Sequence, residues 1–396
     1  MPGLSFSRKA EFMSTAMITL NKEIIHRYTS MLNNKARNEF YYNALKKYAK
    51  NKVVIDVGTG TGILAAYALE HGAKFVYAVE GNRNSANMAQ NVLGKCFDQS
   101  RFKVINTIFP CRQVKQRYQK DMLKDIIKTK SIDLYVGELI GEDLFNEDQV
   151  DIWDELNEYY FRDTVTAISP SANPNAPLSP KQLREIEALK TNDHPVSIPE
   201  KLSADIHIWN SEIEIPDRTG AYKLQELDID AVLLPKFSDA LLNFDKELNS
   251  PITFKFVSTE EEIKLLNKGS TTSYIPPYRK PRREDPRKIW GSHDSSVPEP
   301  DKIIVDVFGV TKDNVPDTIS FSVVIEESGD HTIAINNKLS FEDTSLYLKD
   351  ATSTWQRTCF FRVNIKGKYT FTRDLLNRTT WSMDHEYLPN KKKAKK

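Results

Sequence analysis

The stretch DVGTGTG, Asp56 to Gly62, constrains the fold most, because it joins the apolar run KVVI to the apolar stretch ILAAYALEHG. Glycines at positions 58, 60 and 62 let a ligand approach the backbone closely. A glycine turn between a strand and a helix points backbone N–H groups at a ligand, at the positive end of the helix. The sequence therefore predicts a ligand site at this turn.

The spacing of the glycines selects among ligands. A phosphate-binding P-loop ends in Gly-Lys-Ser/Thr, which does not follow Gly62, and a dinucleotide fingerprint requires glycine where Ile63 stands. The tighter turn suits a nucleoside without a pyrophosphate, and Glu80, at the end of the next expected strand, can accept both ribose hydroxyls. These features favour S-adenosylmethionine over NAD. The alternative is a structural turn beside a surface glutamate.

Strands and helices alternate over the first part of the chain. The runs VVIDV, KFVYAVE, FKVIN and SIDLYVGE read as strands, and GILAAYALEHG and RNSANMAQNVL read as helices, with a further helix at about 23–50. This alternation predicts an α/β, doubly wound and mostly parallel sheet. Later runs such as SADIHIWN and TISFSVVIEE are short and β-like, which predicts an antiparallel β-barrel or sandwich.

Shifts in composition predict the domain boundaries, and 396 residues are enough for two domains. We expect an N-terminal segment at 1–22, a ligand-binding domain at 23–168, a linker with a short helix at 169–198, a β-barrel domain at 199–388 with an exposed basic insertion at 267–300, and a basic tail at 389–396.

Composition excludes several classes of function. Three cysteines and seven scattered histidines show no metal-ligand spacing, and so few unpaired cysteines predict a cytoplasmic or nuclear location. No apolar run reaches bilayer length and no signal pattern opens the chain, so we expect no membrane association. Net charge is +1, but the basic run 279–288 and the tail KKKAKK leave nucleic-acid or acidic-partner binding open beside a solvated loop.

Residues 138–155 carry eight carboxylates and no Lys or Arg. A site entrance with this negative charge repels nucleic acid and attracts cationic peptides. Glu138 and Glu147 follow the fourth expected strand, at the edge where open α/β sheets bind ligands. Two close carboxylates push one pKa upward, whereas a guanidinium keeps both ionised through planar, bidentate bonds. We expect the following acidic residues to form a solvated face instead: Glu142, Asp148, Asp151, Asp154 and Glu155.

The stretch VVIDVGTGTGILAAYALEHGAKFVYAVEGN resembles the cofactor-binding core of the protein arginine methyltransferases. GELIGEDLFNE resembles their double-glutamate loop, STWQRTCFF resembles in part their Thr-His-Trp loop, and RNEFYY with DVGTGTG resembles the monomethylating, type III branch. The resemblance is close over about 25–165 and weaker in the barrel. It implies a class I methyltransferase with a Rossmann-like domain and a β-barrel, which transfers a methyl group from S-adenosylmethionine to arginine in basic proteins.

The resemblance also implies the roles of individual residues. Glu138 and Glu147 would be catalytic and hold the substrate guanidinium, and Trp355 would line the substrate pocket. Arg37, within MLNNKARNEFYYNAL, would pair with the methionine carboxylate of the cofactor. A dimerisation arm would lie within about 212–250 and form a homodimer or a hetero-oligomer with another methyltransferase. The implied cofactor-binding residues are Arg37, Asp56, Gly58, Thr59, Gly60, Gly62 and Glu80.

Departures from the family pattern leave two alternatives open. The loop reads Ser353-Thr354-Trp355 where the family has Thr-His-Trp, and Phe109-Pro110 stands where a glutamate would read the adenine amino group. One alternative is a catalytically weak or inactive partner subunit that binds S-adenosylmethionine and regulates another methyltransferase. The other is a nucleic-acid methyltransferase anchored by the basic insertion, against which the acidic site entrance argues.

Overall fold

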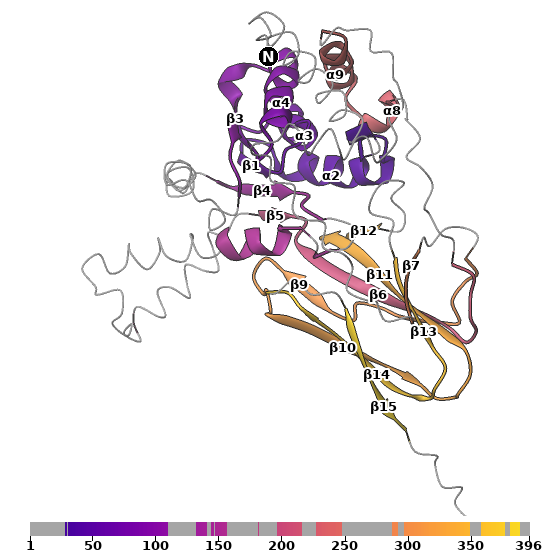
Figure 1. Cartoon of the computed structure of the whole chain (residues 1–396). Coiled ribbons are helices and arrows are strands. Elements are labelled where there is room, and N and C mark those ends of the chain that lie inside the picture. Colours follow the sequence, from indigo (N-terminus) through magenta and orange to yellow (C-terminus); the bar gives the residue numbers. More distant parts are fainter. Residues whose placement is uncertain are drawn as a thin grey trace, which may run out of the picture.

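The computed structural model consists of a parallel sheet with its helices and a set of antiparallel strands (Figure 1). It describes residues 28–29, 31–109, 132–140, 144–145, 147–156, 181, 196–215, 227–247, 287–291, 297–348, 358–376 and 381–388. Several expected features lie outside these residues: the N-terminal segment, the basic tail and Trp355. Of the expected short helix in the linker, only residue 181 is described.

The parallel sheet has the strand order β3-β2-β1-β4-β5. Its strands are β1 (Val53–Val57), β2 (Phe75–Glu80), β3 (Phe102–Asn106), β4 (Leu134–Gly137) and β5 (Val196–Ile198). The chain runs outward from β1 to β3 and returns to β4 on the other side of β1, so that Val57 pairs with both Val79 and Gly137. Ligands of open α/β sheets bind outside the carboxyl ends of the strands at such a reversal. The expectation of a parallel α/β domain is confirmed.

Local sequence sets the ends of the helices in this domain. They are α2 (Lys35–Tyr48), α3 (Ile63–Glu70), α4 (Arg83–Cys96) and the 3-10 turn η1 (Gln99–Arg101). The side chains of Asn34 and Asn82 cap α2 and α4 by accepting hydrogen bonds from N–H groups of the first turn. Residues 63–69 of α3 are all apolar and buried, because the helix contacts α2 as well as β1 and β2. Gly72, with φ +84°, follows its end.

The described antiparallel strands pair as two sheets. The larger has the order β7-β13-β11-β6-β8, with β12 paired to β11 and β9 to β6, and the smaller has the order β10-β14-β15. Strand β10 alternates exposed and buried residues, as a strand with one solvated face does. The antiparallel domain is confirmed, whereas these pairings do not establish a closed barrel. The strands are β6 (Lys201–Trp209), β7 (Lys288–Gly291), β8 (Lys302–Ile304), β9 (Gly309–Thr311), β10 (Thr318–Ile325), β11 (His331–Phe341), β12 (Thr344–Tyr347), β13 (Thr358–Val363), β14 (Gly367–Asp374) and β15 (Ser382–Tyr387).

Two short strands correct the expected boundaries. Val196–Ile198, expected in the linker, is strand β5 and pairs in parallel with β4. Lys288–Gly291, expected in the exposed insertion, is strand β7 and pairs with β13, with Lys288 buried. Both segments are too short for hydrophobic periodicity to indicate a strand.

Helices α8 (Ile229–Val232) and α9 (Pro235–Glu247) interrupt the region expected to be a β-barrel. They follow β6 in the chain, yet they lie beside the helices of the first domain (Figure 1). Phe237 and Leu241 are buried one helical turn apart, and Tyr67 of α3 donates a hydrogen bond of 2.7 Å to the carbonyl oxygen of Val232. The segment lies within 212–250, where an arm was expected, and it contacts the first domain of its own chain.

No helix in the described part of the chain combines the length and the apolar character that crossing a membrane requires.

Candidate active site

The turn between β1 and α3 requires glycine. Gly58, Gly60 and Gly62 have φ values of +74°, +55° and +91°, which other residues rarely adopt. A Cβ atom at Gly58 would lie 2.7 Å from Cδ2 of Leu139, and a Cβ atom at Gly60 would lie 3.0 Å from Cε1 of Tyr28. We call residues 138–149, which follow β4, the acidic loop. The turn is therefore packed between this loop and Tyr28, with no space for a side chain at Gly58.

Asp56 holds this turn from inside. Helix α3 has Gly62 at its N-cap and therefore no capping side chain of its own. Oδ2 of Asp56 accepts hydrogen bonds from the Thr59 hydroxyl and, at 3.0 Å, from the backbone N–H of Ala65 in the first turn of α3. A carboxylate at the end of β1 thus caps the helix. Burial raises the pKa of Asp56 to about 7.

Glu80 connects the turn to the end of β2. Its Oε2 accepts a hydrogen bond of 2.9 Å from the N–H of Gly60, and its Oε1 accepts one of 2.7 Å from the N–H of Asn82. A carboxylate oxygen has two acceptor sites, so each oxygen keeps capacity for a ligand hydroxyl. Glu80 also lines the cavity described next.

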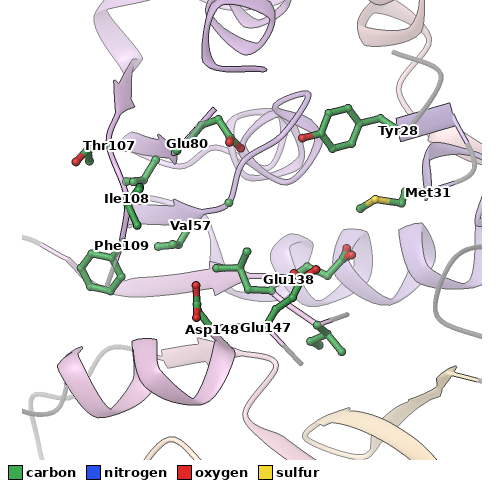
Figure 2. Close-up of a pocket in the computed structure, with 15 residues that line it drawn as sticks. Tyr28, Met31, Val57, Glu80, Thr107, Ile108, Phe109, Glu138, Glu147 and Asp148 are labelled. Carbon is green, nitrogen blue, oxygen red and sulfur yellow. The ribbon is translucent and has the colours of Figure 1, made fainter. Parts of the chain in front are cut away.

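A cavity of about 520 Å³ lies beyond the carboxyl ends of β1, β2 and β4. Figure 2 shows Thr107, Ile108 and Phe109 on one side of it and Glu138 and Glu147 near each other on another. This volume lies within the range of small-molecule sites. The cavity occupies the position that the reversal of strand order predicts for a ligand.

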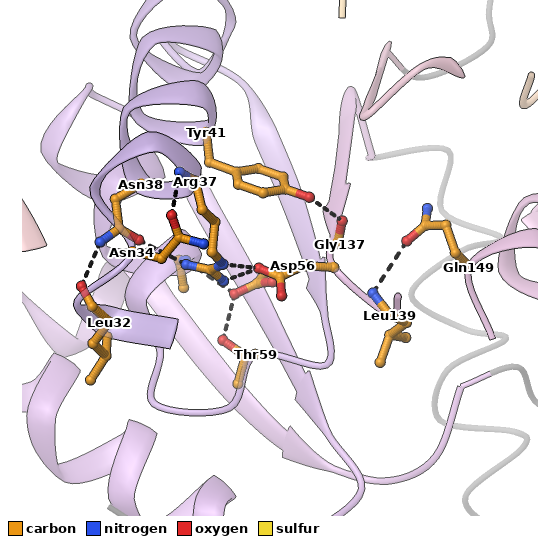
Figure 3. Close-up of polar contacts among 12 residues, drawn as sticks. Leu32, Asn34, Arg37, Asn38, Tyr41, Asp56, Thr59, Gly137, Leu139 and Gln149 are labelled. Carbon is orange, nitrogen blue, oxygen red and sulfur yellow. Dashed lines mark hydrogen bonds and ion pairs between the residues drawn. The ribbon is translucent and has the colours of Figure 1, made fainter. Parts of the chain in front are cut away.

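Gln149 closes the acidic loop at its base. Its backbone N–H donates to the carbonyl oxygen of Leu139 (3.3 Å), and its side-chain Oε1 accepts from the N–H of Leu139 (3.4 Å). Its Nε2 donates to the hydroxyl of Tyr135 in β4 at 3.0 Å. These bonds hold the two ends of the loop together (Figure 3). As a result Glu138 and Glu147, nine residues apart in the sequence, line the same cavity.

Phe145 anchors the middle of the acidic loop in the second domain. Its side chain is buried, and its ring centroid lies 5.9 Å from that of Phe308. The guanidinium carbon of Arg373 in β14 lies 5.1 Å from the same centroid, within the range of a cation–π contact. The antiparallel domain therefore helps to position the loop that carries the two glutamates.

Arg37 and Glu138 form a buried ion pair, each with 3% of its side chain exposed. Nε and Nη2 of Arg37 both contact Oε2 of Glu138, while Nη1 donates to Oδ1 of Asn38 at 2.8 Å (Figure 3). Sequence analysis assigned Arg37 to a cofactor carboxylate. That assignment stays a prediction. In the structure the Arg37 guanidinium lies on Glu138, so this carboxylate already binds the functional group of an arginine side chain.

Four carboxyl groups around the cavity have raised pKa values. Burial raises the pKa of Glu138 to about 7, against the opposing effect of the Arg37 guanidinium. Glu147 is exposed, yet partial desolvation at the cavity wall and the charge of Asp148 raise its pKa, and burial raises the pKa of Glu80. With Asp56, these groups form the kind of cluster that is typical of functional sites. A bound cation would favour the ionised form of Glu138 and Glu147.

The structure brings the sequence-predicted residues together, apart from Trp355, which lies outside the described residues. Gly58, Glu80, Glu138 and Glu147 line the cavity. The other predicted residues lie outside the lining and hold the glycine turn, Glu80 or Glu138 in place: Arg37, Asp56, Thr59, Gly60 and Gly62.

Two members of the expected solvated acidic face are placed differently. Asp148 lines the cavity, and Glu155 is 3% exposed because the helical residues 149–156 turn it inward. Sequence analysis missed Asn38 and Gln149. Asn38 had a signal, since it shares a helical face with Tyr41 and Leu45, which are apolar and buried. Gln149 had none.

Residues 41–128 match the family model described as ribosomal protein L11 methyltransferase. The chain is 25% identical over 237 residues to protein arginine N-methyltransferase 7 of Cricetulus longicaudatus, which covers 56% of this chain and 32% of that protein. It is 33% identical over 128 residues to protein arginine N-methyltransferase 7 of Danio rerio, covering 29% of this chain and 17% of that protein. The matched part thus spans about a third or less of the length of these relatives.

A third relative is protein arginine N-methyltransferase PRMT10 of Oryza sativa subsp. japonica, 25% identical over 193 residues, which cover 48% of this chain and 44% of that protein. The crystal structure of PRMT6 has a TM-score of 0.49 and 14% sequence identity, over 90% of this chain and 98% of that chain. The chain is thus similar in sequence to proteins named as methyltransferases.

Proposed function

We propose that this chain is a protein arginine N-methyltransferase that uses S-adenosylmethionine. One observation carries the proposal. The glycine turn and the paired Glu138 and Glu147 face a single cavity at the reversal of the parallel sheet, and Glu138 already binds a guanidinium. The similarity to relatives named protein arginine N-methyltransferase supports the same activity.

The residues around the turn fit this cofactor. Gly58 and Gly60 supply the left-handed backbone conformation of the turn, and Gly58 lines the cavity. Glu80 keeps acceptor capacity for ribose hydroxyls, and Ile108 and Phe109 offer apolar surface to a base. We assign cofactor binding to these residues and to Asp56, which fixes the turn. When bound, S-adenosylmethionine supplies an electrophilic methyl group.

The acidic side of the cavity fits an arginine substrate. Both contacts from Arg37 end on Oε2 of Glu138, so Oε1 is the oxygen that can accept from a second guanidinium. Glu147 supplies further acceptors from the other end of the loop. Held by two carboxylates, the guanidinium concentrates its charge on the bound nitrogens, and more lone-pair density remains on the nitrogen that accepts the methyl group.

Positioning accounts for most of the rate enhancement in this mechanism. Oriented reactants can lower a barrier by roughly 7–11 kcal/mol. The loop is fixed at its base by Gln149 and in its middle by Phe145, and Arg37 holds the Glu138 carboxylate in place. The proton leaves after the methyl group has been transferred, and this requires no strong base. A lysine ammonium cannot form the planar, bidentate pair that this loop offers.

Methyl transfer to synthetic peptides tests the proposal. We expect S-adenosylmethionine carrying a labelled methyl group to label a Gly/Arg-rich peptide but not the matched Gly/Lys-rich peptide, and mass spectrometry reads the number of methyl groups. The Glu138→Gln variant loses the transfer, whereas Glu39→Gln, which changes an exposed residue of α2, keeps it. Cofactor binding without transfer to any arginine peptide, or transfer to RNA instead, would contradict the proposal.

A further inference from the structure

Asn38 is a buried polar residue in the middle of the site's supporting structure. It follows Arg37 on α2 and is 0% exposed. Its Nδ2 donates two hydrogen bonds of 2.7 Å, one to the carbonyl oxygen of Leu32 and one to that of Ala231 in α8. Its Oδ1 accepts the bond of 2.8 Å from Nη1 of Arg37. All three bonds are buried, so solvent does not compete for them.

These partners allow one orientation of the amide. The NH2 group faces two carbonyl oxygens, and the oxygen faces a guanidinium, which can only donate. A flipped amide would place acceptor against acceptor and donor against donor. Both donors of Asn38 are satisfied, as a buried amide requires.

Asn38 restrains Arg37 from the side opposite Glu138. The Arg37 guanidinium uses Nη1 for Asn38 and uses Nε and Nη2 for Oε2 of Glu138. The ring of Tyr41 lies 5.6 Å from its central carbon. Because the guanidinium is planar and rigid, fixing Nη1 also fixes the direction of the two nitrogens that contact Glu138. Arg37 cannot turn away without breaking its bond to Asn38.

The restraint also involves helix α8, which lies in the sequence of the second domain. Helix α8 belongs to the segment between β6 and β7, about 190 positions after Asn38 in the chain. A continuous series of buried hydrogen bonds therefore runs from the backbone of Ala231 through Asn38 and Arg37 to Glu138. Two further bonds connect the first domain to the α8 segment without passing through Arg37: Tyr67 donates to the carbonyl oxygen of Val232, and Oδ1 of Asn33 accepts from the N–H of Asp228 at the start of α8.

We propose that Asn38 is a positioning residue for methyl transfer, which fixes Arg37 on Glu138 and connects this ion pair to the docked helix α8. The proposal rests on the function proposed above, because it assigns Glu138 to the substrate. It adds a residue outside the cavity lining and a dependence on the α8 segment.

Loss of this restraint has an electrostatic consequence. Glu138 faces Arg37 from α2, Asp56 from β1 and Glu147 from the acidic loop, and Arg37 in turn faces Tyr41 and Tyr67. Arg37 is the cation among these groups and opposes the effect of burial on Glu138. If Arg37 moves away, burial and the charges of Glu147 and Asp56 act unopposed. The pKa of Glu138 then rises.

The first arm of the test measures this pKa without any turnover. Carbon-13 at the glutamate carboxyl carbons is titrated by NMR in the full chain, and Glu138→Gln assigns the signal. We expect Asn38→Leu, which keeps the approximate shape but removes all three hydrogen bonds, to raise the apparent pKa of Glu138 by about one unit. The matched control Asn33→Ala removes a different bond between the first domain and the start of α8, the one from the N–H of Asp228, and leaves this pKa unchanged. Equal titration curves for the unaltered protein and Asn38→Leu would overturn the proposal.

The second arm measures methyl transfer to the arginine peptide as a function of pH. Asn38→Leu shifts the acidic limb of the kcat/KM profile to higher pH, so kcat/KM falls roughly fivefold at pH 7 and recovers above pH 8.5. A purely structural defect would lower the rate equally at every pH, and that outcome contradicts the proposal. If the unaltered protein transfers no methyl group, the proposed function fails, while the titration still decides the role of Asn38.

Folding of the variants is checked by circular dichroism. Where Asn38→Leu does not fold, Asn38→Ser, which keeps a hydroxyl, gives a smaller shift in the same direction. Hydrogen exchange of the Asn38 side-chain amide in the unaltered protein provides a further measurement. We expect slow exchange, because both N–H groups donate to buried carbonyl oxygens. Exchange as fast as that of the exposed Asn210 would overturn the proposal.

Discussion

The glycine turn and the acidic loop face the same cavity, but they are held in place by different kinds of contact. The turn is fixed locally, because Asp56 bonds Thr59 and Ala65, three and nine residues further along the chain. The acidic loop is fixed by distant residues, since Arg37 precedes Glu138 by 101 positions and Arg373, which contacts Phe145, lies in β14. The cofactor side of the site is therefore a property of a short segment, and the substrate side is a property of the whole fold.

The largest expected effect comes from Glu138→Gln, which disrupts the substrate side of the site, the side held by distant residues. It removes the charge that pairs with the buried guanidinium of Arg37 and the carboxylate that binds the substrate guanidinium. Methyl transfer falls by roughly a hundredfold or more, whereas the cofactor Kd changes little because the turn is intact. Methyl-transfer assays and isothermal titration calorimetry check these two results. A variant that transfers methyl groups at the normal rate would contradict the role of Glu138.

Gly58→Ala disrupts the cofactor side of the site, which the glycine turn forms from a short segment. Its φ of +74° and the contact of 2.7 Å between a new Cβ and Leu139 force the turn to shift, at ~2–4 kcal/mol. We expect cofactor affinity to fall at least tenfold. The control Gly94→Ala lies within α4, where alanine favours the helix, and it leaves affinity unchanged. Unchanged cofactor binding in Gly58→Ala would show that the ligand does not approach this turn.

Phe145→Leu weakens the anchor of the acidic loop in the second domain, and we expect a smaller effect than from the two variants above. It removes the ring that faces Phe308 and Arg373 but keeps an apolar side chain, so we expect a loss of about 1 kcal/mol. The KM for the arginine peptide rises while the cofactor Kd stays constant, because the loop loses part of its anchor in the second domain. The control Phe75→Leu removes a comparable ring contact, with Tyr77 in the parallel sheet, and spares KM. If both variants raise KM equally, the anchor has no special role.

The smallest expected effect concerns the dependence of stability on pH. Glu138 and Asp56 titrate at about 7 when folded, against ordinary pKa values of 4.5 and 3.8. Between these limits the folded state binds more protons than the unfolded state, so the free energy of unfolding falls as pH rises from about 4 to 7. Glu80 and Glu147, whose pKa values are also raised, act in the same direction, and Glu138→Gln removes one of these contributions. We expect its Tm to fall less steeply over this range, and parallel Tm curves would contradict the raised pKa of Glu138.

The same difference explains what the sequence could predict. Strands β1 to β4, the glycine turn and Glu80 have periodic or local signals, and the structure has them where the sequence indicates. Charge density and the spacing of Glu138 and Glu147 mark their loop in the sequence, and both residues line the cavity, while their roles stay a prediction. The ion pair of Arg37 with Glu138, the position of Phe145 and the docking of α8 depend on contacts between distant segments. A single sequence has no local pattern for such contacts, and very short strands such as β5 and β7 lack one too.

The most direct measurement is a crystal structure of the chain with S-adenosylhomocysteine and an arginine peptide. The account predicts the nucleoside between the glycine turn and Thr107–Phe109, with the peptide guanidinium bound by Oε1 of Glu138 and by Glu147, its free nitrogen facing the cofactor sulfur. A peptide guanidinium bound elsewhere, with Glu147 turned away from the cavity, would contradict it.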